Sequence, residues 1–137
     1  MAAADDVARS KIPIAQAGLA AFNDGDYERA AGLLHPDIEW DTASLLPDGG
    51  LYRGRDELLA YWRDVAERWD ELRIEPEEWI ETDAAVVMLG RLEGRGAGSG
   101  VPVEGPWHQV WRLKEELPIR CENFSDRDAA LRAGGVV

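Results

Sequence analysis

The sequence predicts an α+β fold in which most of the helices precede a mainly antiparallel sheet. Apolar residues recur at helical spacing in three segments before residue 70, a pattern that indicates amphipathic helices. From Leu72 onward the pattern has period two, which is typical of half-buried strands. The chain has 137 residues, enough for one domain with one core. This order predicts a curved sheet wrapped around helices.

Two helices are predicted before residue 36. The first covers residues 7–22, and its regular part is expected to begin near Pro13, because proline is favoured in a first helical turn. Residues 23–26 (Asn-Asp-Gly-Asp) combine a helix stop, a turn and a new cap. The second helix covers residues 26–34 and ends before Pro36, because proline disfavours helix in the residue that precedes it.

A strand, a loop and a third helix follow. Residues 37–42 alternate strictly between carboxylates and larger side chains, which predicts a half-buried strand. Residues 43–54 are rich in proline and glycine and are predicted to form a loop. Residues 55–69 carry apolar side chains at i, i+3, i+4 and i+7, which predicts an amphipathic helix.

The last part of the chain predicts a series of strands and a short terminal helix over residues 126–133. A glycine-rich segment, residues 94–100, superficially fits a phosphate-binding loop, but such a loop must open a helix. A strand pattern begins at Val101 instead, so we expect a hairpin tip. The predicted strands cover residues 72–80, 84–94, 102–114 and 117–125.

The charge balance excludes several classes of partner. The chain carries 27 acidic and 15 basic side chains, for a net charge of −12. We therefore expect no nucleic-acid partner and no membrane partner, because both need a basic surface. Residues 1–11 show no secretory signal, so a cytoplasmic location is expected. Residues 1–137 are expected to form a single domain, with residues 1–10 as a flexible N-terminal extension.

Metal and cofactor sites are not predicted. Cys121 is the single cysteine, which excludes an intrachain disulfide and a zinc site built on cysteines. His35 and His108 are the two histidines, too few for a histidine-rich site. His35 lies at a helix end, and His108 is expected to face away from the pocket. We therefore expect no metal and no cofactor.

Tryptophan is abundant, with six residues. Five of them fall on apolar stripes, where they can fill the core or line a pocket for a small molecule. The sequence alone favours neither of these two interpretations. The five are Trp40, Trp62, Trp69, Trp107 and Trp111.

Several short segments, in this order and at this spacing, carry a family resemblance. They read FNDGDY at 22–27, LHPDIEW at 34–40, YRGRDEL at 52–58, VWRL at 110–113 and FSDRDAAL at 124–131. The chain thereby resembles the NTF2-like superfamily, in its SnoaL-like branch, over roughly residues 15–135. The resemblance implies an NTF2-like, cystatin-like cone: three N-terminal helices packed in a curved, mixed, mainly antiparallel sheet. It also implies a pocket between helices and sheet, and a homodimer formed through the outer face of the sheet.

The positions that carry acid–base groups in enzymes of this superfamily are changed here. By resemblance, Thr42 stands at the general-base position of the steroid isomerases, and Gln109 and Asn123 stand close to the acid–base positions of the polyketide cyclases. A threonine hydroxyl is too weak a base for proton abstraction from carbon. Amide side chains do not transfer protons. Whether the protein is an enzyme is therefore left open by its sequence.

The remaining candidate site residues depend on which side chains of the last predicted strand, residues 117–125, point into the pocket. Burial alone would place Ile119 and Cys121 inside, and Asn123 shares their face of the strand. The family register implies the opposite, with Arg120, Glu122 and Phe124 facing the pocket. An unpaired Glu122 would act as a general acid or base, whereas a Glu122 paired with Arg120 would orient a ligand.

Two functions follow as hypotheses. The first is an aromatic-lined pocket for a small apolar or aromatic metabolite, in a binding protein or in a cofactor-independent isomerase, cyclase or hydrolase. The alternative is a non-catalytic dimerisation or binding module whose tryptophans fill the pocket. The candidate catalytic residues are Glu122, Gln109 and Arg120. The candidate ligand-binding residues are Trp40, Thr42, Trp62, Met88, Trp107, Trp111 and Phe124.

Overall fold

The structure, a computed structural model, describes residues 10–46 and 49–137, and the predicted N-terminal extension falls largely outside them. The described helices are α2 (Ile12–Asn23), α3 (Tyr27–Gly32), α4 (Arg55–Arg68) and α5 (Arg127–Ala133). The described strands are β1 (Glu39–Ser44), β2 (Leu51–Arg53), β3 (Trp69–Glu81), β4 (Val86–Gly96), β5 (Pro102–Pro106), β6 (His108–Lys114) and β7 (Leu117–Phe124). None of the described helices has the length and apolar character that a membrane span needs.

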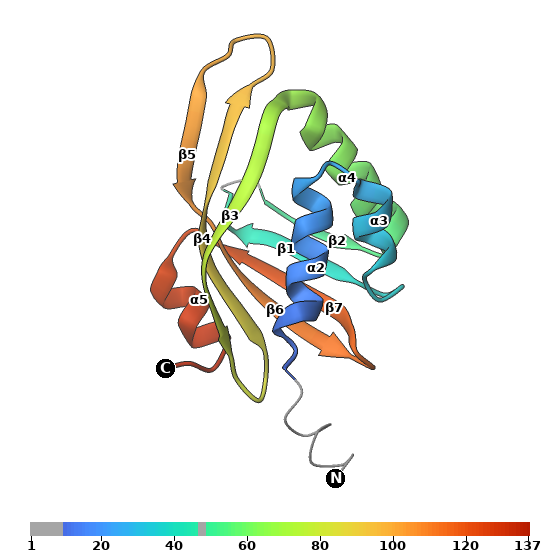
Figure 1. Cartoon of the computed structure of the whole chain (residues 1–137), viewed down its shortest axis with the longest axis vertical. Coiled ribbons are helices and arrows are strands. Elements are labelled where there is room, and N and C mark those ends of the chain that lie inside the picture. Colours follow the sequence, from blue (N-terminus) through green and yellow to red (C-terminus); the bar gives the residue numbers. More distant parts are fainter. Residues whose placement is uncertain (1–9, 47–48) are drawn as a thin grey trace.

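The strands form one curved, mixed sheet in the order β2-β1-β7-β6-β4-β3, with β5 added beside β4. β1 and β7 run parallel, and the other paired strands run antiparallel. Helices α2, α3 and α4 cover the concave face of the sheet, and α5 lies against the opposite, convex face (Figure 1). The predicted α+β cone is confirmed.

Local signals explain where the helices begin and end. Pro13 lies in the first turn of α2, and Gly25, with a φ of 77°, turns the chain after it. The Asp26 carboxylate then accepts a hydrogen bond from the Arg29 N–H (3.2 Å) and caps α3. Such a cap satisfies one of the backbone donors that a helix start leaves without a partner. The turn and cap predicted for residues 23–26 are confirmed.

Two predictions about the strands are corrected. Part of the loop predicted over residues 43–54 is strand β2, which pairs with β1, and its Tyr52 stacks on Tyr61 with ring centroids 3.9 Å apart. The single strand predicted over residues 102–114 is divided at Trp107. Its two halves pair with different parts of β4, and Pro106 at the division has no N–H for the ladder. The predicted hairpin tip at 94–100 is confirmed.

Two apolar clusters stabilise the sheet, one on each face. The cluster on the concave face is built from α2, α3, α4 and the inner strand positions, and its centre is aromatic. The cluster on the convex face is smaller, and there α5 covers Val87, Leu89 and Val110. These three residues are therefore buried within this chain.

Candidate functional site

Cross-strand pairing fixes the facing of the last strand. Gln109 lies opposite Asn123, and Val110 lies opposite Glu122; residues directly opposite each other share a face of the sheet. Val110 packs under α5 on the convex face, so Glu122 is convex, and Asn123 is concave. The expectation that Arg120 and Glu122 face the pocket is wrong, because the concave core buries Cys121 and Asn123 instead.

Phe124 is corrected in the same way. It lies opposite His108 and packs in the convex cluster with Ala130 and Leu131. It therefore contributes to the contact between the sheet and α5, and it is remote from the concave interior where a ligand was expected. His108 faces away from that interior, as predicted.

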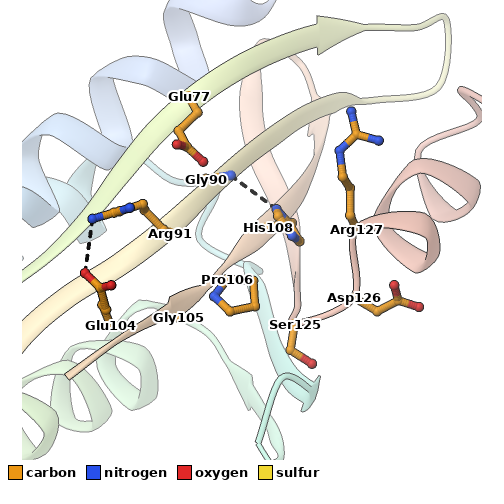
Figure 2. Close-up of a pocket in the computed structure, with 10 residues that line it drawn as sticks. All are labelled: Glu77, Gly90, Arg91, Glu104, Gly105, Pro106, His108, Ser125, Asp126 and Arg127. Atoms are coloured by element: carbon orange, nitrogen blue, oxygen red, sulfur yellow. Dashed lines mark hydrogen bonds and ion pairs between the residues drawn. The ribbon is translucent and has the colours of Figure 1, made fainter.

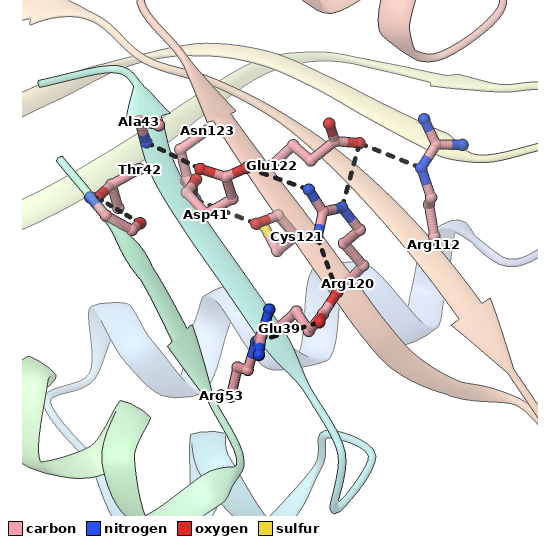
Figure 3. Close-up of polar contacts among 11 residues, drawn as sticks. Glu39, Asp41, Thr42, Ala43, Arg53, Arg112, Arg120, Cys121, Glu122 and Asn123 are labelled. Carbon is pink, nitrogen blue, oxygen red and sulfur yellow. Dashed lines mark hydrogen bonds and ion pairs between the residues drawn. The ribbon is translucent and has the colours of Figure 1, made fainter.

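Arg120 and Glu122 belong to a convex network of ion pairs (Figure 3). The Arg120 guanidinium donates to Glu39 (2.8 Å) and to Asp41 (3.1 Å). The Glu122 carboxylate accepts from Arg112 (3.1 Å) and lies 3.8 Å from the Arg120 Nε. Glu122 is thus an ion-paired carboxylate, one of the two states that the sequence left open. It holds neighbouring strands together on the face opposite the aromatic interior.

The concave face carries a buried chain of amide and indole hydrogen bonds. Asn123 Oδ1 accepts from the Trp107 Nε1 (2.8 Å) and from the Gln109 Nε2 (3.0 Å). The Gln109 Oε1 in turn accepts from the Trp111 Nε1 (3.1 Å). The Asn123 amide nitrogen donates to the Asp41 backbone carbonyl (3.0 Å). Both ends of each amide are engaged, so this chain orients two indole rings.

Thr42 is also engaged by backbone. Its hydroxyl donates to the Gly50 carbonyl (3.2 Å) and accepts from the Gly50 N–H (3.0 Å). The side chain is buried and ties β1 to the segment that leads into β2. These two hydrogen bonds explain why a polar side chain is tolerated in the core.

Aromatic rings fill the centre of the cone. Trp40 packs edge-on against Trp62 (centroids 5.2 Å apart) and Trp111 (5.8 Å), and Phe22 packs against Trp62 (5.5 Å). Such edge-to-face pairs are favoured by the charge distribution of the rings. Met88 is fully buried beside them. Trp40, Trp62, Met88 and Trp111 are therefore core residues, as the alternative hypothesis expected.

The interior offers little acid–base chemistry. Among the described residues, the buried polar side chains are those of Thr42, Gln109, Asn123 and His108; none is a carboxylate, and His108 lies on the convex side. The titratable groups of the concave core cluster are the Cys121 thiol and, at its margin, the phenols of Tyr27, Tyr52 and Tyr61. Burial raises the pKa of the Cys121 thiol well above its ordinary value and also raises the pKa of the Tyr27 phenol. Both groups therefore stay protonated and uncharged at neutral pH.

An apolar groove opens at one end of the cone, between α4 and the strands β3, β4 and β5. Its volume is about 410 Å³. Of the seven predicted ligand-binding residues, Trp107 lines this groove. We call it the α4 groove, and it is lined by Leu46, Tyr61, Val65, Arg68, Trp69, Leu72, Leu92, Gly96, Ser99, Val101, Val103 and Trp107.

Most of these lining residues were missed by sequence reasoning. Trp69 and Trp107 were noted as tryptophans on apolar stripes, but Trp69 was assigned to the end of a helix. It is the first residue of β3 instead, and this places its ring beside Leu72 at the groove. Val101 and Val103 gave a signal too, as apolar residues directly after a hairpin tip.

Comparisons with known proteins agree with this geometry. The family model of the SnoaL-like domain matches residues 15–119. Among curated proteins, none matches the sequence significantly. An NTF2-like protein of unknown function from Burkholderia pseudomallei is 26% identical, with a TM-score of 0.73, over 90% of this chain and 96% of that one.

Two further structures share the fold at lower identity. TerC, co-crystallised with polyporic acid, is 24% identical, with a TM-score of 0.72, over 93% of this chain and 98% of that one. A candidate polyketide cyclase from Xanthomonas campestris pv. campestris is 17% identical, with a TM-score of 0.74, over 87% and 92% of the two chains. At these identities the likeness concerns the fold alone.

Proposed function

The chain belongs to the SnoaL-like domain family, and from that premise we propose that it binds a small, flat, largely apolar molecule in the α4 groove. One observation carries the proposal. Four large apolar side chains are exposed among the described residues, Leu46, Val101, Val103 and Val137, and the first three line this groove. Exposed apolar groups gathered in one concavity are typical of a binding site.

The size and the lining of the groove support a small molecule as the ligand. Its volume of about 410 Å³ lies within the range of small-molecule sites, roughly 300–1,000 Å³. Tyr61, Trp69 and Trp107 supply aromatic surfaces. Large rigid rings give much contact area at a low cost in conformational entropy. A planar apolar or aromatic ligand therefore matches this surface best.

The same lining favours binding over proton transfer. Among the described residues, Tyr61 and Arg68 are the titratable groups that line the groove, and no carboxylate does. Arg68 is paired with Asp64 (2.9 Å) on the surface of α4. Glu122, the predicted acid or base, is ion-paired on the convex face. We therefore propose a binding protein without acid–base catalysis at this site.

TerC is relevant to this proposal only as a compatible example. It shares the fold with this chain and was co-crystallised with polyporic acid. A fold of this kind therefore accommodates an organic ligand. The ligand of this chain must be identified by experiment.

A charge placed in the groove tests the proposal. With 2-naphthol as the probe, we expect Val103→Glu to weaken binding at least about tenfold, because the ligand would bury a carboxylate. Titration followed by tryptophan fluorescence measures the affinity.

The matched control is Val137→Glu, the same change at an exposed valine outside the groove. It should bind 2-naphthol as the wild type does. If both variants and the wild type bind alike, or if the wild type does not bind the probe at all, the proposal is wrong.

A further inference from the structure

A second cavity lies on the convex face, away from the α4 groove. Its volume is about 520 Å³, and its floor includes the backbone of Gly90 and Gly105. Figure 2 shows His108 between the β4–β5 side of the cavity and the segment that opens α5. We call it the convex pocket, defined by Glu77, Arg91, Glu104, His108, Asp126 and Arg127.

His108 offers this pocket a fixed hydrogen-bond donor. The side chain is 7% exposed, and its Nδ1 accepts the Gly90 N–H (3.2 Å). Nδ1 can accept only in the neutral ring, which then carries its proton on Nε2. Burial, with a further contribution from the Arg127 charge, lowers the pKa of His108, which favours that neutral form.

The Nε2–H of His108 has no partner of its own. No described residue forms a hydrogen bond with it, and among the described residues Trp62 Nε1 is the buried side-chain nitrogen without a partner. His108 lines the pocket (Figure 2), so a ligand held there can offer an acceptor to this N–H. A nearly buried imidazole whose donor is held in one direction is suited to an acceptor oxygen of a ligand.

The charges around His108 are mixed. Glu77 lies on β3, and Asp126 and Arg127 lie at the start of α5. On the other wall, Arg91 is held by Glu93 (2.7 Å) and by Glu104 (3.1 Å). Arg127 has a looser pairing, 3.9 Å from Glu78. Arg127 and His108 thus offer donors on one side, and Glu77 offers an acceptor on another.

From this arrangement we propose that the convex pocket binds a small zwitterion of the amino-acid class. The ligand carboxylate accepts from the His108 Nε2–H and pairs with Arg127, and its ammonium group faces Glu77. A simple anion is disfavoured, because three carboxylates and two guanidinium groups line the pocket of a chain with a net charge of −12. A simple cation leaves both donors without an acceptor.

A matched series of probes tests the class of ligand. L-alanine carries both charges, propionate lacks the ammonium group, and ethylammonium lacks the carboxylate. We expect L-alanine to shift the Gly90 amide and His108 ring signals in NMR titrations, and to bind at least about tenfold more tightly than either fragment. Propionate or ethylammonium binding as well as L-alanine, or no response to L-alanine, overturns the proposal.

A variant of His108 tests the contact itself. In His108→Asn the amide oxygen can still accept the Gly90 N–H, while the Nε2–H is lost. We expect L-alanine to bind at least about fivefold more weakly, without loss of fold in the amide spectrum. Arg63→Gln, on α4 and paired with Glu28, should bind as the wild type does.

Two results with these variants would contradict the proposed site. Unchanged L-alanine binding by His108→Asn excludes the histidine contact and with it the proposed site. Loss of L-alanine binding in Val65→Glu, a position on α4 that lines the α4 groove and not the convex pocket, would show that the signal arises there, and it would also contradict the proposal.

Discussion

At the scale of single residues, Asn123 links the aromatic interior to the neighbouring strand β1. Its one oxygen accepts from two donors, the half-buried Trp107 indole and the buried Gln109 amide. Its nitrogen donates to the β1 backbone at Asp41. Removal of this side chain would leave both donors without their acceptor, and for a buried donor such as the Gln109 amide this costs more than a hydrogen bond contributes.

Asn123→Ala should therefore destabilise the fold strongly. We expect the free energy of unfolding to fall by about 3 kcal/mol, because one buried and one half-buried donor lose their acceptor. Urea denaturation measures this change. Gln16→Ala, on the exposed side of α2, is the control and should change the value by less than about 0.5 kcal/mol. Equal effects of the two substitutions would show that the amide chain does not stabilise the interior.

His108 gives the stability a dependence on pH. Burial lowers its pKa below the ordinary value of 6.5. As the pH falls through 6.5, the unfolded chain therefore takes up a proton more readily than the folded chain, and stability decreases. The contribution of His108 is fully present above pH 6.5 and is lost on acidification.

Comparison with His108→Asn isolates this effect from the carboxylates and from His35. Between about pH 8 and about pH 5.5 the wild type should lose more of its free energy of unfolding than the variant. Urea denaturation at both pH values gives the difference. A variant that loses as much as the wild type would exclude His108 as the source.

The sequence predicted which residues are buried better than it predicted on which face of the sheet a strand residue lies. Trp40, Trp62 and Trp111 were placed on apolar stripes and are core residues. Period-two alternation shows which residues of a strand share a face, but it does not show which face lies inside. Glu122 was therefore placed in the pocket by family register, whereas burial of Cys121 determines the facing in the structure.

At the scale of elements, α5 determines which part of the sheet is covered. Gly134 caps this helix, and a Cβ at that position would lie 2.2 Å from the Val87 Cγ2 on β4. The absence of a side chain therefore lets α5 approach the convex face. The glycine has a negative φ, so the requirement is one of space and not of backbone conformation.

Gly134→Ala should push α5 away from the sheet and lower the free energy of unfolding by about 1–3 kcal/mol. The matched substitution is Gly32→Ala at the end of α3, where a Cβ would meet nothing within 4 Å. There we expect no change or a gain of up to about 1 kcal/mol, because alanine favours helix. Thermal unfolding of both variants checks the difference. Equal effects would contradict close packing of α5.

The exact ends of helices and strands are a second feature that apolar patterns in the sequence predict poorly. The helix predicted to reach residue 69 ends at Arg68, and Trp69 opens β3 directly. An apolar residue at the junction of a helix and a strand fits the apolar spacing of the helix and the alternation of the strand equally well. This one-residue difference places the Trp69 ring in the α4 groove, which no periodicity could have indicated.

At the scale of the whole molecule, the aromatic cluster divides the cone into a filled centre and an open end. The fold was predicted in full outline from the order of helices and strands and from the family resemblance. The groove was not, because its walls, α4 and the strands β3, β4 and β5, are brought together by tertiary packing that apolar periodicity does not describe.

The expected homodimer remains a prediction, which native mass spectrometry measures. Its sequence argument was that a partner would bury an apolar outer face. The structure weakens that argument, because α5 covers Val87, Leu89 and Val110.

One measurement tests the central claim most directly. The six tryptophan indole N–H groups give separate NMR signals, and Trp69 and Trp107 line the α4 groove. On titration with 2-naphthol, we expect the signals of these two to shift, while those of the buried Trp40, Trp62 and Trp111 stay in place. Shifts confined to the three buried indoles, or no shift in any, would contradict a binding site in the groove.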